Sequence, residues 1–371
     1  MDKVRKCSHR NSAASQGYSR SDFDHSPLLL FYEITRACSL RCRHCRAEAQ
    51  PNRHPLELSA ADARKLVDEA CRFDKPPMLV ITGGDPARRP DLIDIIRYAT
   101  GRNIRTALTP AATRVISHEF IAQLKDAGLH RLAVSIDAAE AALHDGFRGV
   151  TGSFARTLDI LADARDCRLP FQVNRTITRD NIRQIDAIYD LMQNVSPVLW
   201  SLFFLIPMGR ASAGVERISA IDFEMIFAKL AQWSDQSPFA IKTTEAPHYR
   251  RFLQERARFT QVRSGVRTDR QLVGTNDGRG VMFVSHIGEV FPSGFLPIQC
   301  GRFPRDSLVD VYQHSPLFKR LRDPDQLQGK CGSCDYRELC GGSRARAFGV
   351  TGDPLAAEPD CMFISDSQGA V

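Results

Sequence analysis

The sequence alternates between short apolar runs and longer amphipathic stretches with helical periodicity, and this alternation constrains the fold most strongly. We expect strands over residues 28–35, 78–82, 104–109, 131–136, 171–177 and 199–206. We expect helices over residues 60–72, 91–100, 117–127, 153–165 and 182–193, with Ser59 and Ser117 as helix-capping residues. Such alternation favours parallel βαβ units. Six units make about three quarters of an eightfold barrel, whose catalytic residues follow the carboxyl ends of the strands.

The alternation weakens after Arg210, and the end of the chain is rich in cysteine and glycine. A further helix over residues 221–234 and a β-hairpin over residues 281–291 are expected there. We therefore predict an α/β protein with three parts. These are a partial (β/α)6 TIM-like barrel over residues 27–215, a helical connecting region over 216–274 and a small cysteine-rich cluster-binding domain over 275–371.

Residues 1–26 are polar and contain no apolar core segment, which argues against a secretory signal and predicts a disordered start to a cytoplasmic protein. The longest apolar run, around residues 198–208, has the length of a strand, so we expect no transmembrane helix and no membrane partner. The net charge of +7 comes from scattered basic residues. This pattern argues against a nucleic-acid partner and suits an anionic small substrate or an anionic metal cluster.

Three cysteines, Cys38, Cys42 and Cys45, lie immediately after the first expected strand. Three thiolates on one short loop can bind three irons of a cubane cluster and leave the fourth iron open. A structural metal site normally has four protein ligands instead. From the spacing alone a zinc site remains an alternative, because His44 or His54 could be the fourth ligand.

This spacing, with the ring of His44 directly before the last cysteine, resembles the signature of the radical S-adenosylmethionine (SAM) superfamily. The resemblance implies a [4Fe-4S] cluster on the three cysteines, with SAM at the open iron. It also implies SAM contacts from further along the barrel: His44, Gly83, Gly84, Asp85, Ser135, Asp137, Arg148 and Asn174. Asp85 is a mild departure, because the superfamily more usually has glutamate at that position.

The activity that the resemblance implies is a radical reaction. An electron from the reduced cluster breaks the C5′–S bond of SAM, and the resulting 5′-deoxyadenosyl radical removes a hydrogen atom from the substrate. This chemistry needs an electron donor such as ferredoxin or flavodoxin.

A second set of cysteines lies near the end of the chain, at Cys331, Cys334, Cys340 and Cys361. Four thiolates could hold zinc. However, the arrangement resembles the SPASM domain, the auxiliary-cluster module of many radical SAM maturation enzymes. A full SPASM domain has further cysteines where this chain has Ser293 and Arg344. The resemblance therefore implies one auxiliary [4Fe-4S] cluster with full protein ligation, two clusters in all, and Cys300 bound to neither.

The runs at residues 82–86, 207–210 and 292–297 resemble a branch that contains haem d1 and Fe-coproporphyrin side-chain enzymes together with peptide maturases. The first hypothesis is modification of a tetrapyrrole side chain, with substrate contacts from Arg210, His248 and Tyr249. The second is maturation of a ribosomally made precursor peptide. The third, from a different class, is a non-catalytic zinc-binding scaffold.

Overall fold

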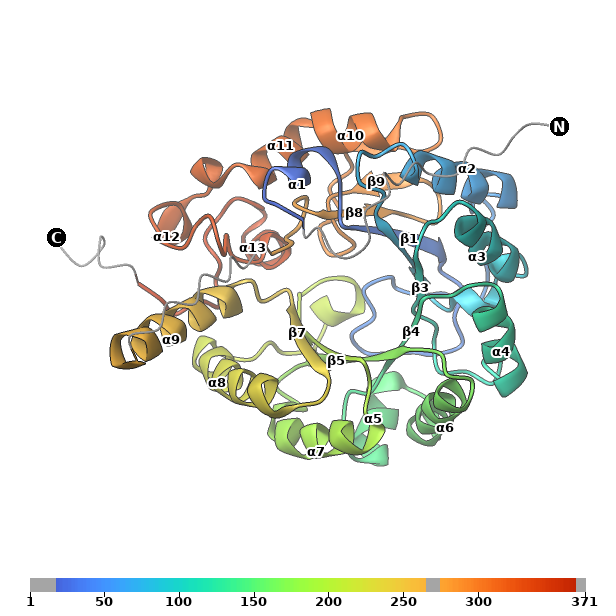
Figure 1. Ribbon diagram of the computed structural model, residues 1–371, viewed down its shortest axis with the longest axis horizontal. Helices are drawn as coiled ribbons and strands as arrows, with labels where there is room; N and C mark the ends of the chain where they lie inside the picture. The colour runs from blue at the N-terminus through green and yellow to red at the C-terminus, as the bar shows by residue number, and fades with distance from the viewer. Residues whose placement is uncertain (1–17, 265–273, 365–371) are drawn as a thin grey trace.

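The computed structural model describes residues 18–264 and 274–364, and its strands form one ten-stranded sheet in the order β10-β9-β8-β1-β2-β3-β4-β5-β6-β7. Figure 1 shows the strands around the centre of the molecule, with helices on the outside. The six expected strands are present as β1 Leu29–Thr35, β2 Met78–Gly83, β3 Thr106–Leu108, β4 Arg131–Ser135, β5 Phe171–Ile177 and β6 Leu199–Phe204. Their parallel pairing in chain order confirms the partial barrel.

Helices cover the outer face between these strands. The five that periodicity predicted are α2 Ala60–Ala70, α3 Leu92–Gly101, α4 His118–Asp126, α6 Ser153–Asp166 and α7 Ile185–Val195. Ser59 and Ser117 cap α2 and α4, because their side chains accept hydrogen bonds from backbone N–H groups in the first turn. One short helix after β4, α5 Ala141–Arg148, was not expected and carries Arg148 at its end.

The sheet continues past the six expected strands at both edges. After α8 Ala220–Gln236, β7 Ala240–Thr244 pairs in parallel with β6, and β8 Val281–Val284 pairs in parallel with β1. β8 and β9 Glu289–Phe291 form the expected antiparallel hairpin, which β10 Gly301–Arg302 extends. Because later strands add to both edges, the sheet runs across the expected domain boundaries near residues 215 and 275.

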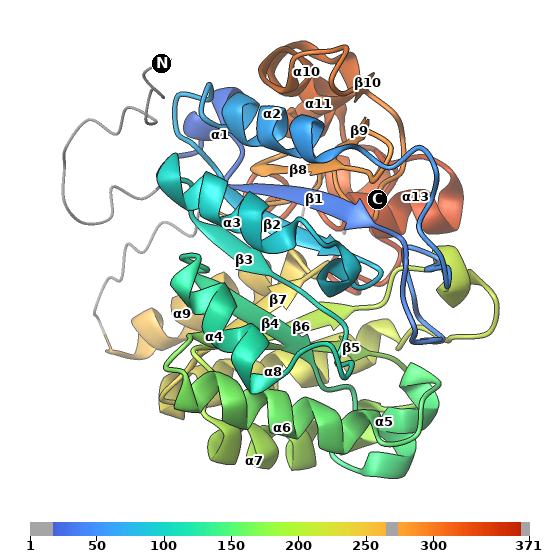
Figure 2. The same ribbon diagram turned by 90° about the vertical axis from the view of Figure 1, so that its right-hand side faces the viewer.

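The last part of the chain contributes short helices at one side of the barrel. They are α10 Leu308–His314, α11 Pro316–Arg322, α12 Gly329–Gly332 and α13 Arg344–Thr351, and α9 His248–Ser264 precedes them after β7. Figure 2 shows α10 and α11 next to β8 and β9. Within residues 18–264 and 274–364, no helix has the length and apolar character needed to cross a membrane.

Residues 18–26 have defined structure, which corrects the expectation of a disordered segment up to residue 26. α1 Asp22–His25 buries Phe23 at its centre. The Tyr312 hydroxyl donates a hydrogen bond to the Phe23 carbonyl oxygen at 2.8 Å, and the Leu28 N–H donates to the Gly280 carbonyl oxygen at 2.9 Å. Contacts with distant residues therefore order this segment, which local sequence patterns cannot indicate. The rest of the expected segment, residues 1–17, lies outside the described residues.

Candidate active site

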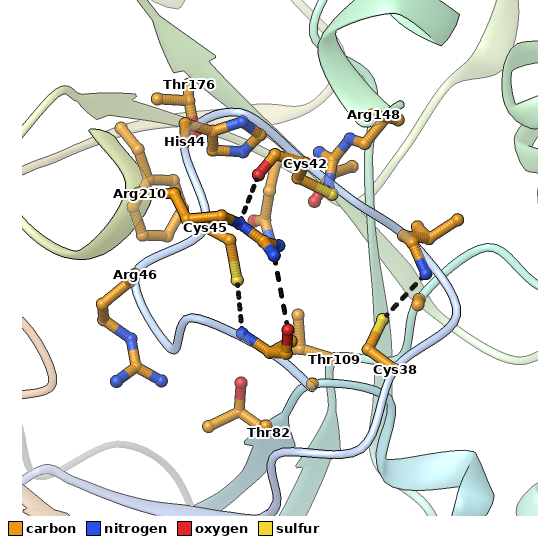
Figure 3. A pocket seen from close by; sticks show the side chains of 18 of the residues that line it. Cys38, Cys42, His44, Cys45, Arg46, Thr82, Thr109, Arg148, Thr176 and Arg210 are labelled. Atoms are coloured by element: carbon orange, nitrogen blue, oxygen red, sulfur yellow. Dashed lines mark hydrogen bonds between the residues drawn. The ribbon is translucent and has the colours of Figure 1, made fainter. Parts of the chain in front are cut away.

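A cavity opens at the carboxyl ends of the parallel strands, where barrel enzymes place their chemistry. Figure 3 shows the three cysteines of the loop after β1 around this cavity, with Arg148 and Arg210 beside them. Most of the residues singled out from the sequence line it: Cys38, Cys42, His44, Cys45, Gly83, Gly84, Ser135, Arg148, Asn174 and Arg210. The fold thus brings together groups that are far apart in the chain.

Backbone hydrogen bonds fix the loop that carries the three cysteines. The Cys38 N–H donates to the Gln50 carbonyl oxygen at 2.7 Å, which closes the loop on itself. The N–H groups of Arg41 and Arg43 donate to carbonyl oxygens at the end of α5, at 3.1 and 3.0 Å. These backbone hydrogen bonds, two of them to the end of α5, fix the loop and therefore the positions of Cys38 and Cys42.

The turn after β6 holds the same loop from the other side. The Arg210 side chain donates from Nε to the Cys42 carbonyl oxygen at 2.9 Å and from Nη1 to the Ala49 carbonyl oxygen at 3.3 Å. Gly209, next to it, has a φ of +54°, and a Cβ there would lie 2.6 Å from the Cys45 carbonyl oxygen. Only glycine permits both the left-handed backbone and this close approach.

Two of the three thiols, Cys38 and Cys42, are buried, and Cys45 beside them is half-buried. Burial raises the pKa of Cys38 to about 11 and raises that of Cys42, and negative charge on the neighbouring thiols raises both further. Positive groups partly offset this effect at Cys42, whose Sγ accepts a hydrogen bond from Arg148 Nη1 at 3.8 Å. Metal ligation requires thiolates, and a metal centre compensates the negative charge that this site disfavours. The donor set therefore fits a metal cluster.

His44 faces the same cavity with its ring stacked on Phe147, at a centroid distance of 4.3 Å and an angle of 16°. Burial lowers the pKa of the imidazole to about 4, so the ring is neutral at pH 7. Its Nδ1 has no hydrogen-bond partner within the described part of the chain. A neutral, stacked ring is suited to packing or hydrogen bonding with a ligand and unsuited to carrying a positive charge.

Asp137 was expected to contact SAM but is not among the residues that line the cavity. Its buried carboxylate pairs with Arg148 at 2.6 Å and accepts a hydrogen bond from the Thr176 N–H at 2.9 Å. Burial by itself would raise the pKa of Asp137, but the Arg148 guanidinium and nearby imidazoles hold it below its ordinary value. In this structure Asp137 orients Arg148, which does line the cavity.

Asp85 also lies outside the cavity lining and is fully buried. Its Oδ1 accepts hydrogen bonds from the N–H groups of Ala87 and Ala111 at 3.2 and 3.3 Å, and its Oδ2 accepts one from the Thr113 hydroxyl at 3.0 Å. The carboxylate thereby ties the end of β2 to the loop after β3. Since Thr109 at the start of that loop lines the cavity, Asp85 supports the cavity wall from behind.

Sequence reasoning missed part of the lining. Thr82, Thr109 and Thr176 stand at or just beyond the carboxyl ends of β2, β3 and β5, so the strand-end rule applied to every strand would have found them. Arg46 gave no such signal, because its partners are distant: its Nη2 pairs with Glu33 at 2.9 Å and its guanidinium lies 4.7 Å from the Phe283 ring centroid. An apolar wall was also missed: Phe203, Phe204, Leu205, Ile206, Met208 and Phe295.

The four C-terminal cysteines line a second cavity, away from the first. His248, expected near the barrel mouth, lines this second cavity instead, because α9 begins there and the ring packs against Phe223 and Phe227 of α8. Tyr249 packs in the main apolar core and lines neither cavity. Of the three expected substrate contacts, the structure therefore brings Arg210 alone to the first cavity.

Comparison with known proteins agrees with this geometry. The family described as the radical SAM superfamily matches residues 32–192, which contain the first cysteine set and β2 to β5. An "AdoMet-dependent heme synthase" from Methanosarcina barkeri is 36% identical over 342 residues, which cover 91% of this chain and 97% of that protein. The chain belongs to the radical SAM superfamily.

One further relative and one solved structure are also similar to this radical SAM enzyme. A "PqqA peptide cyclase" from Rhodopseudomonas palustris is 27% identical over 353 residues, covering 91% of this chain and 87% of that protein. The crystal structure of Streptococcus suis SuiB bound to S-adenosylmethionine superposes with a TM-score of 0.70 at 16% identity, covering 91% of this chain and 78% of that one. At this identity the superposition establishes the fold alone. Membership of the superfamily implies SAM and a [4Fe-4S] cluster as cofactors, and it excludes the non-catalytic zinc scaffold.

Proposed function

We propose that Cys38, Cys42 and Cys45 hold the [4Fe-4S] cluster of this radical SAM enzyme and that SAM binds in the first cavity. The support is the meeting of the three thiols with residues at strand ends around one space: Gly83, Gly84, Ser135 and Asn174. His44 from the cysteine loop and Arg148 from the end of α5 line the same space. When bound, the cluster and SAM together supply a 5′-deoxyadenosyl radical that takes a hydrogen atom from the substrate. The protein's own part is to orient both ligands and to exclude water.

We further propose that the substrate is a tetrapyrrole whose propionate side chain loses its carboxyl group. The observation that carries this proposal is the 36% identity, over nearly the full length of both chains, with a protein named as a haem synthase. The cavity has suitable chemistry for such a ligand. Its aromatic and aliphatic wall suits a flat apolar macrocycle, and its guanidinium groups suit carboxylates.

Arg210 is the cation in this cavity that best fits an anionic ligand. Arg46 and Arg148 already have carboxylate partners, Glu33 and Asp137. Within residues 18–264 and 274–364, Arg210 has only carbonyl oxygens as partners, and its buried Nη2 has no hydrogen-bond partner. A carboxylate, from SAM or from the substrate, would satisfy that nitrogen and compensate the charge.

We also propose a second [4Fe-4S] cluster on Cys331, Cys334, Cys340 and Cys361. All four thiols line one cavity, and burial together with neighbouring thiols raises the pKa of Cys340 to about 12, so a metal centre would relieve an unfavourable set of charges. Removal of one hydrogen atom and of CO2 from a propionate leaves a vinyl group and one electron. A cluster held by these four cysteines would supply a one-electron acceptor for it.

The test is anaerobic incubation of the purified protein with SAM, a reductant and Fe-coproporphyrin III, followed by measurement of 5′-deoxyadenosine and of porphyrin mass. We expect deoxyadenosine above the substrate-free background and a porphyrin lighter by the mass of each lost formic acid equivalent. Deoxyadenosine at background level would refute the substrate assignment for this porphyrin. About eight irons per chain are expected from two clusters, whereas about four would refute the second cluster.

Peptide maturation is a second candidate, because relatives such as the peptide cyclase also span nearly the whole chain. Its support is weaker, since identity falls from 36% to 27%. The two candidates share the first cluster and SAM and differ only in the substrate. Protein that cleaves SAM in the presence of dithionite, yet shows no response to the porphyrin, would favour the peptide candidate.

A further inference from the structure

Arg344 is a fully buried cation without a carboxylate partner. Its side chain is 1% exposed, and it donates to the carbonyl oxygens of Gly342, Pro354 and Ala356 at 3.3, 3.1 and 2.7 Å. Within the described ranges, no carboxylate oxygen lies within 4.0 Å of its guanidinium nitrogens. Neutral carbonyl groups hold the guanidinium in place but supply no full negative charge, and incomplete compensation of a cation is costly in a protein interior.

The nearby acidic groups have other partners. Arg346, two residues further on, pairs with Glu358 at 3.3 Å and with Asp360 at 3.1 Å. The buried Asp277 accepts hydrogen bonds from the Ser293 hydroxyl and from the Ala345 N–H. The contrast between Arg344 and Arg346, which are both buried and lie two residues apart, indicates that Arg344 has a different close counterpart.

That counterpart is the second cysteine set. Arg344 Nη2 lies 3.9 Å from the Sγ of Cys331. Gly342 makes this approach possible, because a Cβ at that position would lie 2.4 Å from Arg344 Nη2 and 3.4 Å from the Cys331 Sγ. Asp277 also interacts electrostatically with Arg344, but no described carboxylate oxygen lies within 4.0 Å of the guanidinium nitrogens. A thiolate, or a cluster that the thiolates hold, would therefore be the nearer negative charge.

His248 is a second buried side chain whose missing partner would be a cluster on the C-terminal cysteines. The side chain is 1% exposed and lines the second cavity, yet neither ring nitrogen has a hydrogen-bond partner within the described residues. Phe223 and Phe227 pack against the ring at centroid distances of 4.8 and 4.9 Å and offer no hydrogen-bond acceptor for its N–H. An imidazole always has at least one N–H to donate. A sulfur of a cluster in the cavity would accept it.

Backbone groups add further donors to the sulfurs. The N–H groups of Glu358, Tyr336 and Gly342 donate to the Sγ atoms of Cys331, Cys334 and Cys340 at 3.2, 3.4 and 3.3 Å. The reduction potential of an iron–sulfur cluster depends on its net charge, its hydrogen bonds and its exposure. Each donor and each nearby positive charge stabilises the reduced, more negative state.

We propose that Arg344 and His248 raise the reduction potential of the C-terminal cluster and thereby make it an electron acceptor. Arg344 supplies a fixed positive charge beside Cys331, and His248, which lines the cavity, supplies a hydrogen bond. This inference rests on the proposed second cluster, because both side chains act on it. Neither residue ligates iron; both tune and position the centre that the cysteines hold.

The experiment is an anaerobic redox titration followed by electron paramagnetic resonance, with full-length protein in which Cys38, Cys42 and Cys45 are replaced by alanine. In that background only the C-terminal cluster titrates. We expect R344Q to lower the ratio of reduced to oxidised cluster at a fixed potential by at least tenfold, which equals 59 mV for one electron. We expect H248F, which keeps an aromatic ring but removes its N–H, to lower the ratio about threefold.

R337Q is the matched control. Arg337 lines the same cavity but pairs with Asp325 at 3.4 Å, and its side chain is 39% exposed, so its charge is compensated and solvated. We expect R337Q to change the ratio of reduced to oxidised cluster by less than twofold. The proposal would be overturned if R344Q protein retains four irons and its ratio of reduced to oxidised cluster at a fixed potential is within twofold of that of its parent. If R344Q loses iron, the H248F variant becomes the test. A midpoint potential of H248F equal to that of its parent also overturns the proposal. A parent without iron at this site would instead refute the second cluster itself.

Discussion

Replacing Glu33 by glutamine is expected to destabilise the protein strongly. The carboxylate is fully buried on β1, where it pairs with Arg46 at 2.9 Å and Arg36 at 3.1 Å and contacts His286 Nδ1 at 2.9 Å. Burial alone would raise its pKa, but Arg46, the His286 hydrogen bond and Arg36 together lower it from 4.5 to about 2. The folded state therefore favours the charged form strongly.

The magnitude follows from that pKa. One pKa unit corresponds to about 1.4 kcal/mol, so a fall from 4.5 to about 2 corresponds to about 3 kcal/mol of stability. Breaking a buried ion pair by removing one partner costs about 3–5 kcal/mol, which agrees. For a chain of 371 residues, an unfolding entropy of about 2 cal/mol/K per residue converts 3 kcal/mol into a fall of about 4 °C in Tm.

The assay is thermal unfolding of E33Q and wild-type protein under anaerobic conditions. The control is E216Q, because Glu216 also pairs with an arginine, Arg179, but both side chains are more than 60% exposed. That pair should contribute less than about 1 kcal/mol. The stability of a group with a lowered pKa is fully present above its unfolded pKa, so the E33Q effect should be constant from pH 8 to about 5.5. A Tm within 1 °C of wild type would refute the reasoning.

Three further changes test other parts of the structure. D85A should cost about 3 kcal/mol and raise the KM for SAM, because three donors around a buried carboxyl group lose their acceptor. D85N should keep most of the stability and most of the affinity for SAM, and urea unfolding with SAM kinetics checks this. G209A should lower iron bound at the first cluster at least twofold, since its Cβ would meet the Cys45 carbonyl oxygen; full iron content would contradict the proposed clash. Burial and the nearby Asp277 raise the pKa of Glu245, so the folded state loses stability as pH rises above the unfolded value. E245Q should therefore be more stable than wild type at pH 9 by about 1 kcal/mol or more, and equal Tm values at that pH would contradict the raised pKa.

Local patterns were sufficient for the barrel, and the family resemblance added residues on its strand ends. Strand–helix alternation placed β1 to β6, and the resemblance indicated Ser135 and Asn174, both of which line the cavity. These features depend on residues close in sequence or on the parallel topology itself. The resemblance also indicated Asp137 and Asp85, which lie outside the cavity lining, because a motif does not distinguish a side chain that faces the cavity from one that supports a neighbour.

Other features depended on contacts between distant segments. Arg46 reaches the cavity through a partner on β1 and a ring on β8, and β8 itself adds to β1 across more than 240 residues of sequence. His248, expected to contact the substrate, lines the second cavity because the packing of α9 on α8 decides which way the ring turns. Apolar periodicity identifies a buried face, but it does not identify which of two cavities that face approaches.

The pairing of β8 with β1 has a consequence for the order of events during synthesis. β1 leads directly into the loop with the first three cysteines, yet one of its two neighbouring strands comes from residues 281–284. A ribosome must therefore translate three quarters of the chain before that loop has its final support. The scaffold for the first cluster matures late, and a nascent chain that stalls before this point would present an unpaired β1 edge to other proteins. Iron delivery to Cys38, Cys42 and Cys45 is accordingly expected to follow translation and not to accompany it.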